Sequence, residues 1–413
     1  MLLKNGTVCD YAQERKADVR IDGGKIVEVC ENILPRAGEE VLECDGYVIM
    51  PALIDMASPK NKTLSRKTLQ SLTQKALSGG VGSVLLRPDS TPRIDSESII
   101  ELVLSLDSAL NVHFLPSIAP YKDGRIVEIA SLVANGAYAI FLESGIKGGI
   151  EGYALHKIAQ YAQMLEVPII ASPQESSLSD GAMNEGMICA ELGLPGISSL
   201  AQTIEVARFC EMARFSQTKW VLDVISEKES LDIIAFFRQF GAQILTQTSI
   251  HHLILSDEHC RQFDTRFKLF PPLKDSGTRD FLCSVLESRI DMLTCLQSDS
   301  YKSLKDQVFE SASFGINAFE IYLALGIEYL VKPKLISLSR FSELTSYAQA
   351  QLLKLPKGAI EQGKDADLVI VDCSSYVEVS DMSSPYYGQK LAGKVVQTLV
   401  AGKVYTPSSL ANK

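Results

Sequence analysis

Short apolar runs recur through the middle of the chain and alternate with segments of helical periodicity. Eight such runs lie at 47–55, 82–87, 111–116, 137–142, 167–171, 220–225, 242–246 and 290–294. Continuous runs rich in Ile and Val are typical of strands that a parallel sheet buries on both faces. The segments between them, such as 65–77 and 231–240, have the spacing of amphipathic helices. Eight strand–helix units predict an α/β fold, a TIM-type (β/α)8 barrel.

Both ends of the chain have a different pattern, in which short apolar runs are separated by turn residues. Asn5-Gly6 and Asp22-Gly23 separate such runs near the N-terminus, and this arrangement is a hairpin signal. The C-terminal end shows the same pattern. Neither end is large enough to hold a core alone. We therefore predict one small β domain from residues 1–50 plus 358–413, which encloses a barrel of residues 51–357.

Composition excludes several classes of protein. The 413 residues carry a formal charge of −10 and no long basic run, which argues against a nucleic-acid surface. No apolar run reaches the roughly 18 residues that a membrane span needs, and the N-terminus lacks the apolar core of a signal peptide. The nine cysteines form no C-x-x-C pair, which is typical of reduced thiols. We expect a soluble cytoplasmic protein.

Four acidic residues lie near the ends of predicted strands, where a barrel of this type places its active site. They are Asp55, Glu143, Glu175 and Asp223. Carboxylates gathered there could bind Mg²⁺ or Ca²⁺ through oxygen. Equally, they could be solvated acids in loops. The sequence leaves both interpretations open, and no histidine or cysteine accompanies Asp55 at the end of the first barrel strand.

Four short motifs occur in a characteristic order along the chain. Gly181-Ala-Met-Asn-Glu-Gly186 is followed by His251-His252-Leu253, by Phe270-Pro-Pro-Leu-Lys274 and by Gly363-Lys-Asp-Ala-Asp-Leu-Val369. In this order they resemble the dihydroorotases of the amidohydrolase superfamily, and the resemblance covers nearly the whole chain. It implies a barrel with a β domain and, for active members, the hydrolysis of a cyclic amide.

The resemblance also implies one or two divalent ions, zinc above all, that polarise the amide and generate hydroxide. In the family an H-x-H motif, two further histidines and a catalytic aspartate form that site. The corresponding positions of this chain carry other residues: Ala57, Pro59, Ser172, Val224 and Leu296. Because so many ligands are missing, we predict that this site binds no zinc and that the chain has no cofactor.

The positions that would contact the substrate also differ. Asn61 stands where the family has an arginine for the substrate carboxylate, and Asp89 stands where it has an asparagine. An acid at that position repels an acidic substrate. His251 and His252 match a family motif near the substrate, and two interpretations stay open for them. They are either weak ligand-binding residues or loop packing inherited from an active ancestor.

Three functions follow from these observations. The first is a catalytically silent dihydroorotase homologue, which the resemblance implies is a structural and assembly partner of aspartate transcarbamoylase in pyrimidine biosynthesis, with self-association as a further expectation. The second is an active cyclic-amide hydrolase whose metal site is displaced onto acids or onto His251 and His252. The third is a metal-free protein that binds a pyrimidine intermediate. We expect the first, with partner surfaces near 192–207 and Tyr386-Tyr387.

Overall fold

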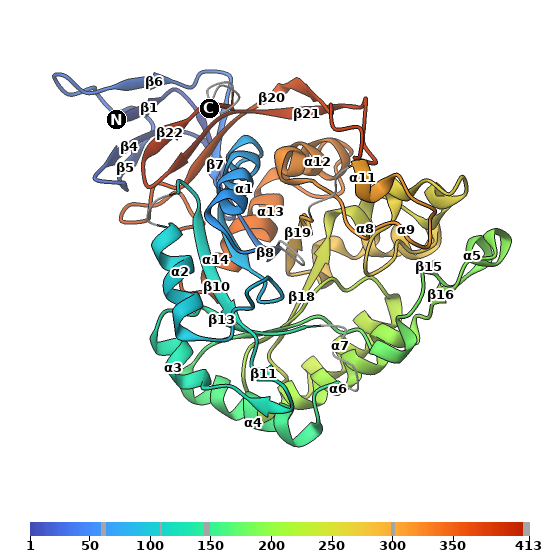
Figure 1. Ribbon diagram of the computed structural model, residues 1–413. Helices are drawn as coiled ribbons and strands as arrows, with labels where there is room; N and C mark the ends of the chain where they lie inside the picture. The colour runs from blue at the N-terminus through green and yellow to red at the C-terminus, as the bar shows by residue number, and fades with distance from the viewer. Residues whose placement is uncertain (59–62, 108–109, 144–148, 299–301, 408–413) are drawn as a thin grey trace.

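An eight-stranded parallel sheet forms the centre of the molecule (Figure 1). The computed structural model describes residues 1–58, 63–107, 110–143, 149–298 and 302–407. This sheet confirms the predicted TIM-type barrel. Its strands, in spatial order, are β8 (Leu53–Ser58), β9 (Val81–Leu86), β10 (His113–Ile118), β13 (Ala139–Leu142), β14 (Ile169–Ala171), β17 (Trp220–Leu222), β18 (Ile244–Ser249) and β19 (Met292–Thr294).

Side chains close the barrel between its first and last strands. Asp55 in β8 accepts hydrogen bonds from the Thr294 hydroxyl at 2.8 Å and from the Cys295 backbone N–H at 2.9 Å. The Ser58 hydroxyl accepts a hydrogen bond from the Gln297 backbone N–H at 3.0 Å. The two edge strands therefore share side-chain hydrogen bonds where other neighbouring strands share a backbone ladder.

Apolar side chains from alternate positions fill the barrel interior, as the two-residue period of a strand requires. Met56, Leu85, Phe141, Val221 and Met292 belong to this interior cluster, and each comes from a different strand. A second and larger apolar cluster lies between the strands and the surrounding helices. The barrel is thus a packed core whose polar side chains gather at the strand ends.

Helices alternate with the strands and cover the outside of the barrel. The first begins where Ser65 caps it, since the Ser65 hydroxyl accepts a hydrogen bond from the Thr68 backbone N–H at 3.2 Å. The helices are α1 (Arg66–Ser78), α2 (Glu97–Asp107), α3 (Ile129–Ala134), α4 (Gly152–Leu165), α5 (Met187–Leu192), α6 (Leu200–Ser216), α7 (Lys228–Gln239), α8 (Ile250–Ile254), α9 (Ser276–Ser284), α10 (Leu286–Arg289), α11 (Lys302–Lys305), α12 (Tyr322–Gly326), η5 (Ile327–Val331), α13 (Leu338–Ser342), η6 (Glu343–Tyr347) and α14 (Ala348–Leu352).

Both ends of the chain form the β-rich part beside the barrel, as predicted (Figure 1). A four-stranded sheet has the order β5-β4-β1-β6, and a six-stranded sheet has the order β22-β21-β20-β7-β2-β3. The second sheet joins N-terminal to C-terminal strands. The domain boundaries at residues 50 and 358 stay a prediction. The strands are β1 (Leu2–Lys4), β2 (Thr7–Cys9), β3 (Glu14–Lys16), β4 (Asp18–Asp22), β5 (Lys25–Cys30), β6 (Val41–Glu43), β7 (Val48–Pro51), β20 (Leu368–Glu378), β21 (Lys390–Val400) and β22 (Lys403–Tyr405).

The apolar run 47–55 is two strands, and its prediction as a single strand was wrong. β7 belongs to the six-stranded sheet, and β8 begins the barrel two residues later. Ala52 separates them, because its N–H donates to the Asp367 carbonyl at 2.9 Å and its carbonyl accepts from the Ser346 hydroxyl at 2.8 Å. An apolar pattern cannot reveal this division, since both strands are buried. Each of the other seven predicted runs overlaps a barrel strand.

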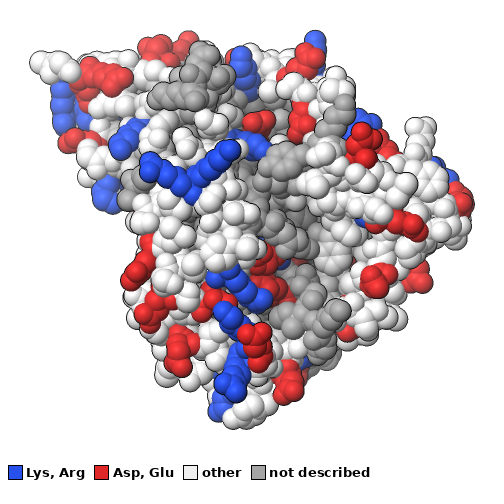
Figure 2. Space-filling model, viewed as in Figure 1, with Lys and Arg blue, Asp and Glu red and all other residues white. Residues whose placement is uncertain are grey.

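The charges on the visible face are mixed, and the described helices are short or polar. Acidic and basic side chains are interspersed over the face in Figure 2, and the described residues drawn there form no continuous basic surface. Within the described ranges, every helix is too short or too polar to cross a membrane. The cytoplasmic location stays a prediction.

Candidate functional site

A buried arginine occupies the barrel mouth, the region formed by the carboxyl-terminal ends of the strands. Arg87 directly follows β9, and its side chain is 3% exposed. The guanidinium lies 4.5 Å from the centre of the Phe141 ring. It donates hydrogen bonds to Asp89 at 3.3 Å and to Asp223 at 3.4 Å. A permanent positive charge therefore stands among the acids of the mouth.

Asp223 is the acid most deeply enclosed by this cluster. It follows β17, and its carboxylate accepts hydrogen bonds from Gln247 at 2.7 Å and from the Ser172 hydroxyl at 3.1 Å. Burial raises the pKa of Asp223 above its ordinary value, and the charge of Arg87 opposes that shift. Both carboxylate oxygens thus accept hydrogen bonds from side chains of this chain.

A second ion pair lies next to the first. Arg93 contacts Glu143 at 3.0 Å between Nη2 and Oε2. Burial raises the pKa of Glu143 to about 6, and Arg93 opposes the shift. In the face shown in Figure 2, acidic and basic side chains lie side by side at the central hollow. The mouth therefore places two arginines among three acids, Asp89, Asp223 and Glu143.

The other two acids that the sequence singles out have structural partners. Asp55 is fully buried and closes the barrel through Thr294 and Cys295. Glu175 caps the 3₁₀ helix η1 (Ser176–Leu178), where its carboxylate accepts the Leu178 N–H at 3.0 Å, and the Ser177 hydrogen bonds lower its pKa. In the described part of the chain, Glu175 makes no hydrogen bond with Arg87 or Asp223.

The cavity that remains beside the cluster is small. It has a volume of about 90 Å³ and shares Ser172 and Glu143 with the cluster. Pockets that enclose small organic ligands usually measure roughly 300–1,000 Å³. A larger groove of about 860 Å³ lies elsewhere, between the β-rich part and the helices η5 and α13. The pocket that these described residues line is thus smaller than a typical site for an organic ligand.

The five histidines of the chain are spread over the molecule. His113 begins β10, where it contacts Asp367 at 3.5 Å, and His156 on α4 packs against a phenylalanine ring. His259 caps the 3₁₀ helix η2 (Asp257–Cys260). Only His251 and His252 are neighbours, and both are buried. No third histidine is placed to complete a metal site with them.

His251 and His252 have structural contacts on one ring nitrogen each. His251 Nδ1 shares a hydrogen bond of 2.8 Å with the Tyr386 hydroxyl, and His252 Nε2 donates to the Pro271 carbonyl at 3.1 Å. Burial lowers the pKa of His251 to about 3 and that of His252 to about 4. Their ligand-binding role stays a prediction. Tyr386 is buried, so its expected place on a partner surface was wrong, whereas Tyr387 is 47% exposed.

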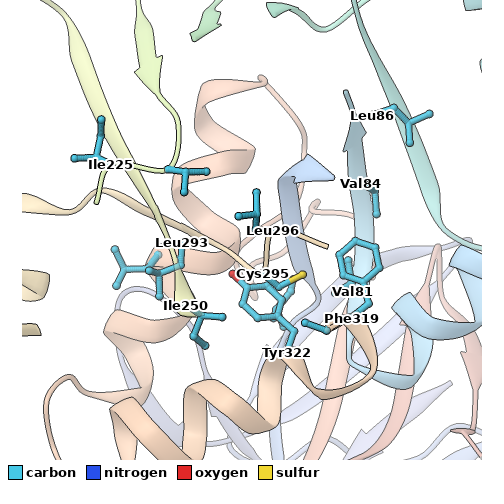
Figure 3. Packing of buried hydrophobic residues seen from close by; sticks show 14 of the residues in the cluster. Val81, Val84, Leu86, Ile225, Ile250, Leu293, Cys295, Leu296, Phe319 and Tyr322 are labelled. Carbon is cyan, nitrogen blue, oxygen red and sulfur yellow. The ribbon is translucent and has the colours of Figure 1, made fainter. Parts of the chain in front are cut away.

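Two of the substituted family positions keep an unusual backbone. Val224 and Leu296 have φ values of 54° and 49°, in the left-handed region that branched side chains rarely adopt. Their side chains pack into the outer apolar cluster, and Figure 3 shows Leu296 and Cys295 near Tyr322. Such strained conformations are typical of functional sites. Here they accompany side chains that have no polar atom.

The remaining positions complete the comparison with the predicted site. Ser172 follows β14 and belongs to the cluster, while Ala57 lies in β8. Pro59 and Asn61 lie outside the described residues. Asp89 accepts hydrogen bonds from Arg87, and its Oδ1 has no hydrogen-bond partner in the described part of the chain. The sequence analysis missed Arg87 and Gln247. The position of Arg87 directly after a strand was the signal that could have revealed it.

Two motifs of the sequence meet in space. The Lys274 ammonium donates to the Asn184 side-chain carbonyl at 3.0 Å and also pairs with Glu227. A Cβ at Gly181 would lie 2.7 Å from the backbone of Gly196, so that position requires glycine. These contacts fix the segment around the strands β15 (Met183–Asn184) and β16 (Gly196–Ile197). The motifs thus have a structural role in this chain.

Comparison with known proteins identifies the family. Residues 275–405 match the model of the amidohydrolase family. The dihydroorotase of Syntrophus aciditrophicus is 30% identical over 427 residues, which span 98% of each chain. The chain is a dihydroorotase-like member of the amidohydrolase superfamily. A probable dihydroorotase-like protein of Helicobacter pylori J99 is 29% identical over 98% of this chain and 97% of its own. An L-hydantoinase from Arthrobacter aurescens shares the fold, with a TM-score of 0.87, 18% identity and coverage of 98% and 95%.

The residues of this dihydroorotase-like chain do not fit the divalent metal that the family implies. In the described ranges, no three His, Cys, Asp or Glu side chains are arranged to hold a metal ion. The acids of the mouth face Arg87 and Arg93 instead. A second cation beside these guanidinium groups would be repelled, and its carboxylate ligands already accept hydrogen bonds.

Proposed function

We propose that this chain is a catalytically silent dihydroorotase homologue, a pseudoenzyme that serves as a structural and assembly partner of aspartate transcarbamoylase in pyrimidine biosynthesis. One observation carries the first half of the proposal. The guanidinium of Arg87 lies in the barrel mouth with Asp223 as its counter-ion, at 3.4 Å. A metal hydrolase polarises its substrate with a bound cation, whereas the positive charge in this mouth is a guanidinium already paired with a carboxylate. This contrast supports the lack of catalysis.

The second half rests on the scaffold. Relatives named dihydroorotase match this chain along almost its full length, and the family resemblance implies that its metal-ligand positions carry other residues. A fold can keep its architecture while its chemistry changes, because function depends on the site. Stable partner contacts need about 800 Å² on each side, which the outer surface of a barrel can provide. The partnership with aspartate transcarbamoylase is what the family resemblance implies.

A turnover assay tests the lack of catalysis. The purified chain is incubated with Zn²⁺, Co²⁺ or Mn²⁺, and the interconversion of dihydroorotate and carbamoyl aspartate is followed together with the metal content. We expect no turnover above background and no stoichiometric metal. The Syntrophus dihydroorotase serves as the positive control. Turnover that depends on a bound metal would overturn the proposal and support an active hydrolase with a displaced metal site.

A binding experiment tests the partnership separately. The chain is mixed with the aspartate transcarbamoylase of the same organism and analysed by size-exclusion chromatography with light scattering. We expect the two proteins to elute together in a defined ratio. Separate elution at micromolar concentrations would refute the partnership and leave the lack of catalysis intact.

One observation favours a second candidate function, a metal-free protein that binds a pyrimidine intermediate. Asp89 Oδ1 and Gln247 Oε1 are buried acceptors without a hydrogen-bond partner in the described ranges. Amide N–H groups of a pyrimidine ring would satisfy such acceptors. Specific binding raises the apparent stability by mass action, so dihydroorotate should raise the melting temperature of the wild type and not that of Asp89→Ala. An equal response of both proteins would exclude this function.

A further inference from the structure

A cavity lies at the end of the barrel opposite the mouth. It has a volume of about 510 Å³ and is lined by Ile244 and Met292, the first residues of β18 and β19. Lys219, which directly precedes β17, also lines it. Pockets that enclose small organic ligands usually measure roughly 300–1,000 Å³. This cavity, the basal pocket, is therefore large enough for such a ligand, unlike the pocket of about 90 Å³ at the mouth.

The floor of the basal pocket is apolar and belongs to the barrel interior. Met292 and Leu352 are buried members of the interior cluster, and Leu245 and Ala348 pack against that cluster. α14 supplies both Ala348 and Leu352, so this helix forms one wall of the pocket. An apolar ligand body that covers these side chains would remove their surface from water, which favours binding.

Three basic and two acidic side chains line the basal pocket, and both acids are already paired. Asp291 pairs with Arg238, and Glu343 accepts a hydrogen bond from Arg340 at 2.7 Å. The third base is Lys219, which is exposed and has no ion pair in the described part of the chain. The basal pocket therefore keeps one positive charge without a counter-ion.

Arg340 offers the pocket a donor as well as a charge. Its Nη1 donates to Glu343, and its Nη2 donates to the Ile290 carbonyl at 2.8 Å. Its Nε is buried and has no hydrogen-bond partner within the described ranges, since the Glu287 carboxylate lies 3.9 Å away. Buried polar groups in folded proteins are nearly always hydrogen-bonded. This N–H is therefore a candidate donor to an oxygen atom of a ligand.

The wall of the basal pocket contains a widened helical turn. η6 is a π-helix, after which the Ala348 N–H donates to the carbonyl of Glu343, five residues earlier. Glu343, Tyr347 and Ala348 all line the pocket. Single π turns inserted in α-helices occur frequently at functional sites. This feature of the backbone is independent of the charges, and it indicates the same pocket.

We propose that the basal pocket binds a small organic monocarboxylate with an apolar body. The carboxylate pairs with Lys219, and the apolar body covers Met292 and Leu352. One negative charge matches the one unpaired positive charge. A phosphate monoester carries a charge of about −1.5 to −2 near pH 7, so it would bring more negative charge than the pocket neutralises. The site is separate from the barrel mouth and does not rest on the proposed function.

A titration of the full-length wild type tests the ligand class. The probes are 4-phenylbutyrate and octanoate, with the neutral 4-phenylbutanamide as the matched control, and binding is measured by isothermal titration calorimetry. We expect both carboxylates to bind in a one-to-one ratio at millimolar concentrations. The amide has the same apolar body without the charge, so its dissociation constant should be about fivefold higher, the upper end for one exposed ion pair.

Three variants locate the site. Lys219→Gln should raise the dissociation constant of 4-phenylbutyrate about fivefold and leave that of the amide unchanged. Ala348→Phe places a ring in the pocket and should abolish the binding of both. Lys122 of β11 (Tyr121–Lys122) follows β10 on the mouth side, and its side chain is 55% exposed. Lys122→Gln removes the same charge at the other end of the barrel and should have no effect.

Four outcomes would overturn the proposal. The first is that neither carboxylate binds the wild type at millimolar concentrations, and the second is equal affinity for 4-phenylbutyrate and its amide. The third is weaker binding by Lys122→Gln and not by Lys219→Gln, which would place the anion at the mouth. The fourth is unchanged binding by Ala348→Phe with the circular dichroism spectrum of the wild type. If that variant does not fold, Lys219→Gln decides alone, because its side chain is exposed.

Discussion

Removing the charge of Arg87 should destabilise the barrel mouth strongly. In Arg87→Met the side chain keeps most of its length and loses its guanidinium, which leaves Asp223 buried without a counter-ion. At 3.4 Å and an effective dielectric constant of about 20, the pair attracts by about 5 kcal/mol. Breaking a buried pair on one side costs about 3–5 kcal/mol. We therefore expect the free energy of unfolding to fall by about 3–5 kcal/mol at pH 8.

The pH dependence identifies the cause. Burial already raises the pKa of Asp223, and the loss of Arg87 raises it further. A carboxyl group whose pKa is higher in the folded state destabilises the protein above its unfolded pKa, so the cost of Arg87→Met should grow as the pH rises from the pKa of Asp223 in the wild type to its higher pKa in the variant. Its steepest change is about 1.4 kcal/mol per pH unit. Urea unfolding at several pH values measures this cost. The signal is the fluorescence of Trp220, which is the single tryptophan of the chain and lies three residues before Asp223.

A double-mutant cycle provides the control. Asp223→Asn keeps the shape of the side chain and removes its charge. When Arg87→Met is made in that background, its cost should fall by at least about 1.5 kcal/mol, because a contacting pair couples. If Arg87→Met costs less than 1 kcal/mol and does not depend on pH, or if the two changes are additive, the ion pair does not have the role assigned to it here.

Three further predictions follow from buried groups. Burial lowers the pKa of His252 to about 4, so its contribution to stability is complete above about pH 6.5 and declines toward pH 4. His252→Gln should therefore reduce the slope of unfolding free energy against pH by up to about 1.4 kcal/mol per pH unit in this range. An unchanged slope would contradict this prediction. Val224 has a φ of 54°, so Val224→Gly should have a free energy of unfolding about 1 kcal/mol higher than that of Val224→Ala. At Val221 in β17, the glycine variant should instead be less stable than the alanine variant. If urea unfolding gives a difference of the same sign at both positions, backbone strain at Val224 is excluded. Cys30 is the only exposed cysteine of the nine, so one thiol should react rapidly with a disulfide reagent, and two or more fast thiols would refute this burial pattern.

Most of the fold could be predicted because it depends on apolar periodicity. Strands buried on both faces have continuous apolar runs, and eight of these in alternation with helices have few other solutions. The division of 47–55 at Ala52 could not be predicted, because it depends on hydrogen bonds to Asp367 and Ser346, which lie about 300 residues away in the sequence. Periodicity contains no information about such partners.

For the site, the sequence predicts mainly which metal ligands of the family are missing. Family motifs indicated which ligands are missing, and position in the chain indicated which acids stand near the mouth. The partners of those acids could not be derived, since Arg87, Ser172 and Gln247 come from three different strand ends. Sequence distance says little about which strand ends meet across a barrel. The role of Asp55 in closing the barrel was equally inaccessible, because its partner Thr294 is on the last strand.

Ser172, Val224 and Leu296, at positions where the family resemblance implies metal-site residues, have structural contacts or backbone roles in this chain. Val224 and Leu296 keep left-handed backbones because the chain must still turn sharply after β17 and β19, whatever side chain stands there. Asp223 places a buried carboxylate in the mouth, and such a charge requires a counter-ion, which Arg87 provides from across the barrel, since β14, β13 and β10 separate their two strands. Under the proposed function, new histidines alone would not create a metal site in this mouth. The guanidinium would have to leave as the metal arrives, since each excludes the other from the same carboxylate.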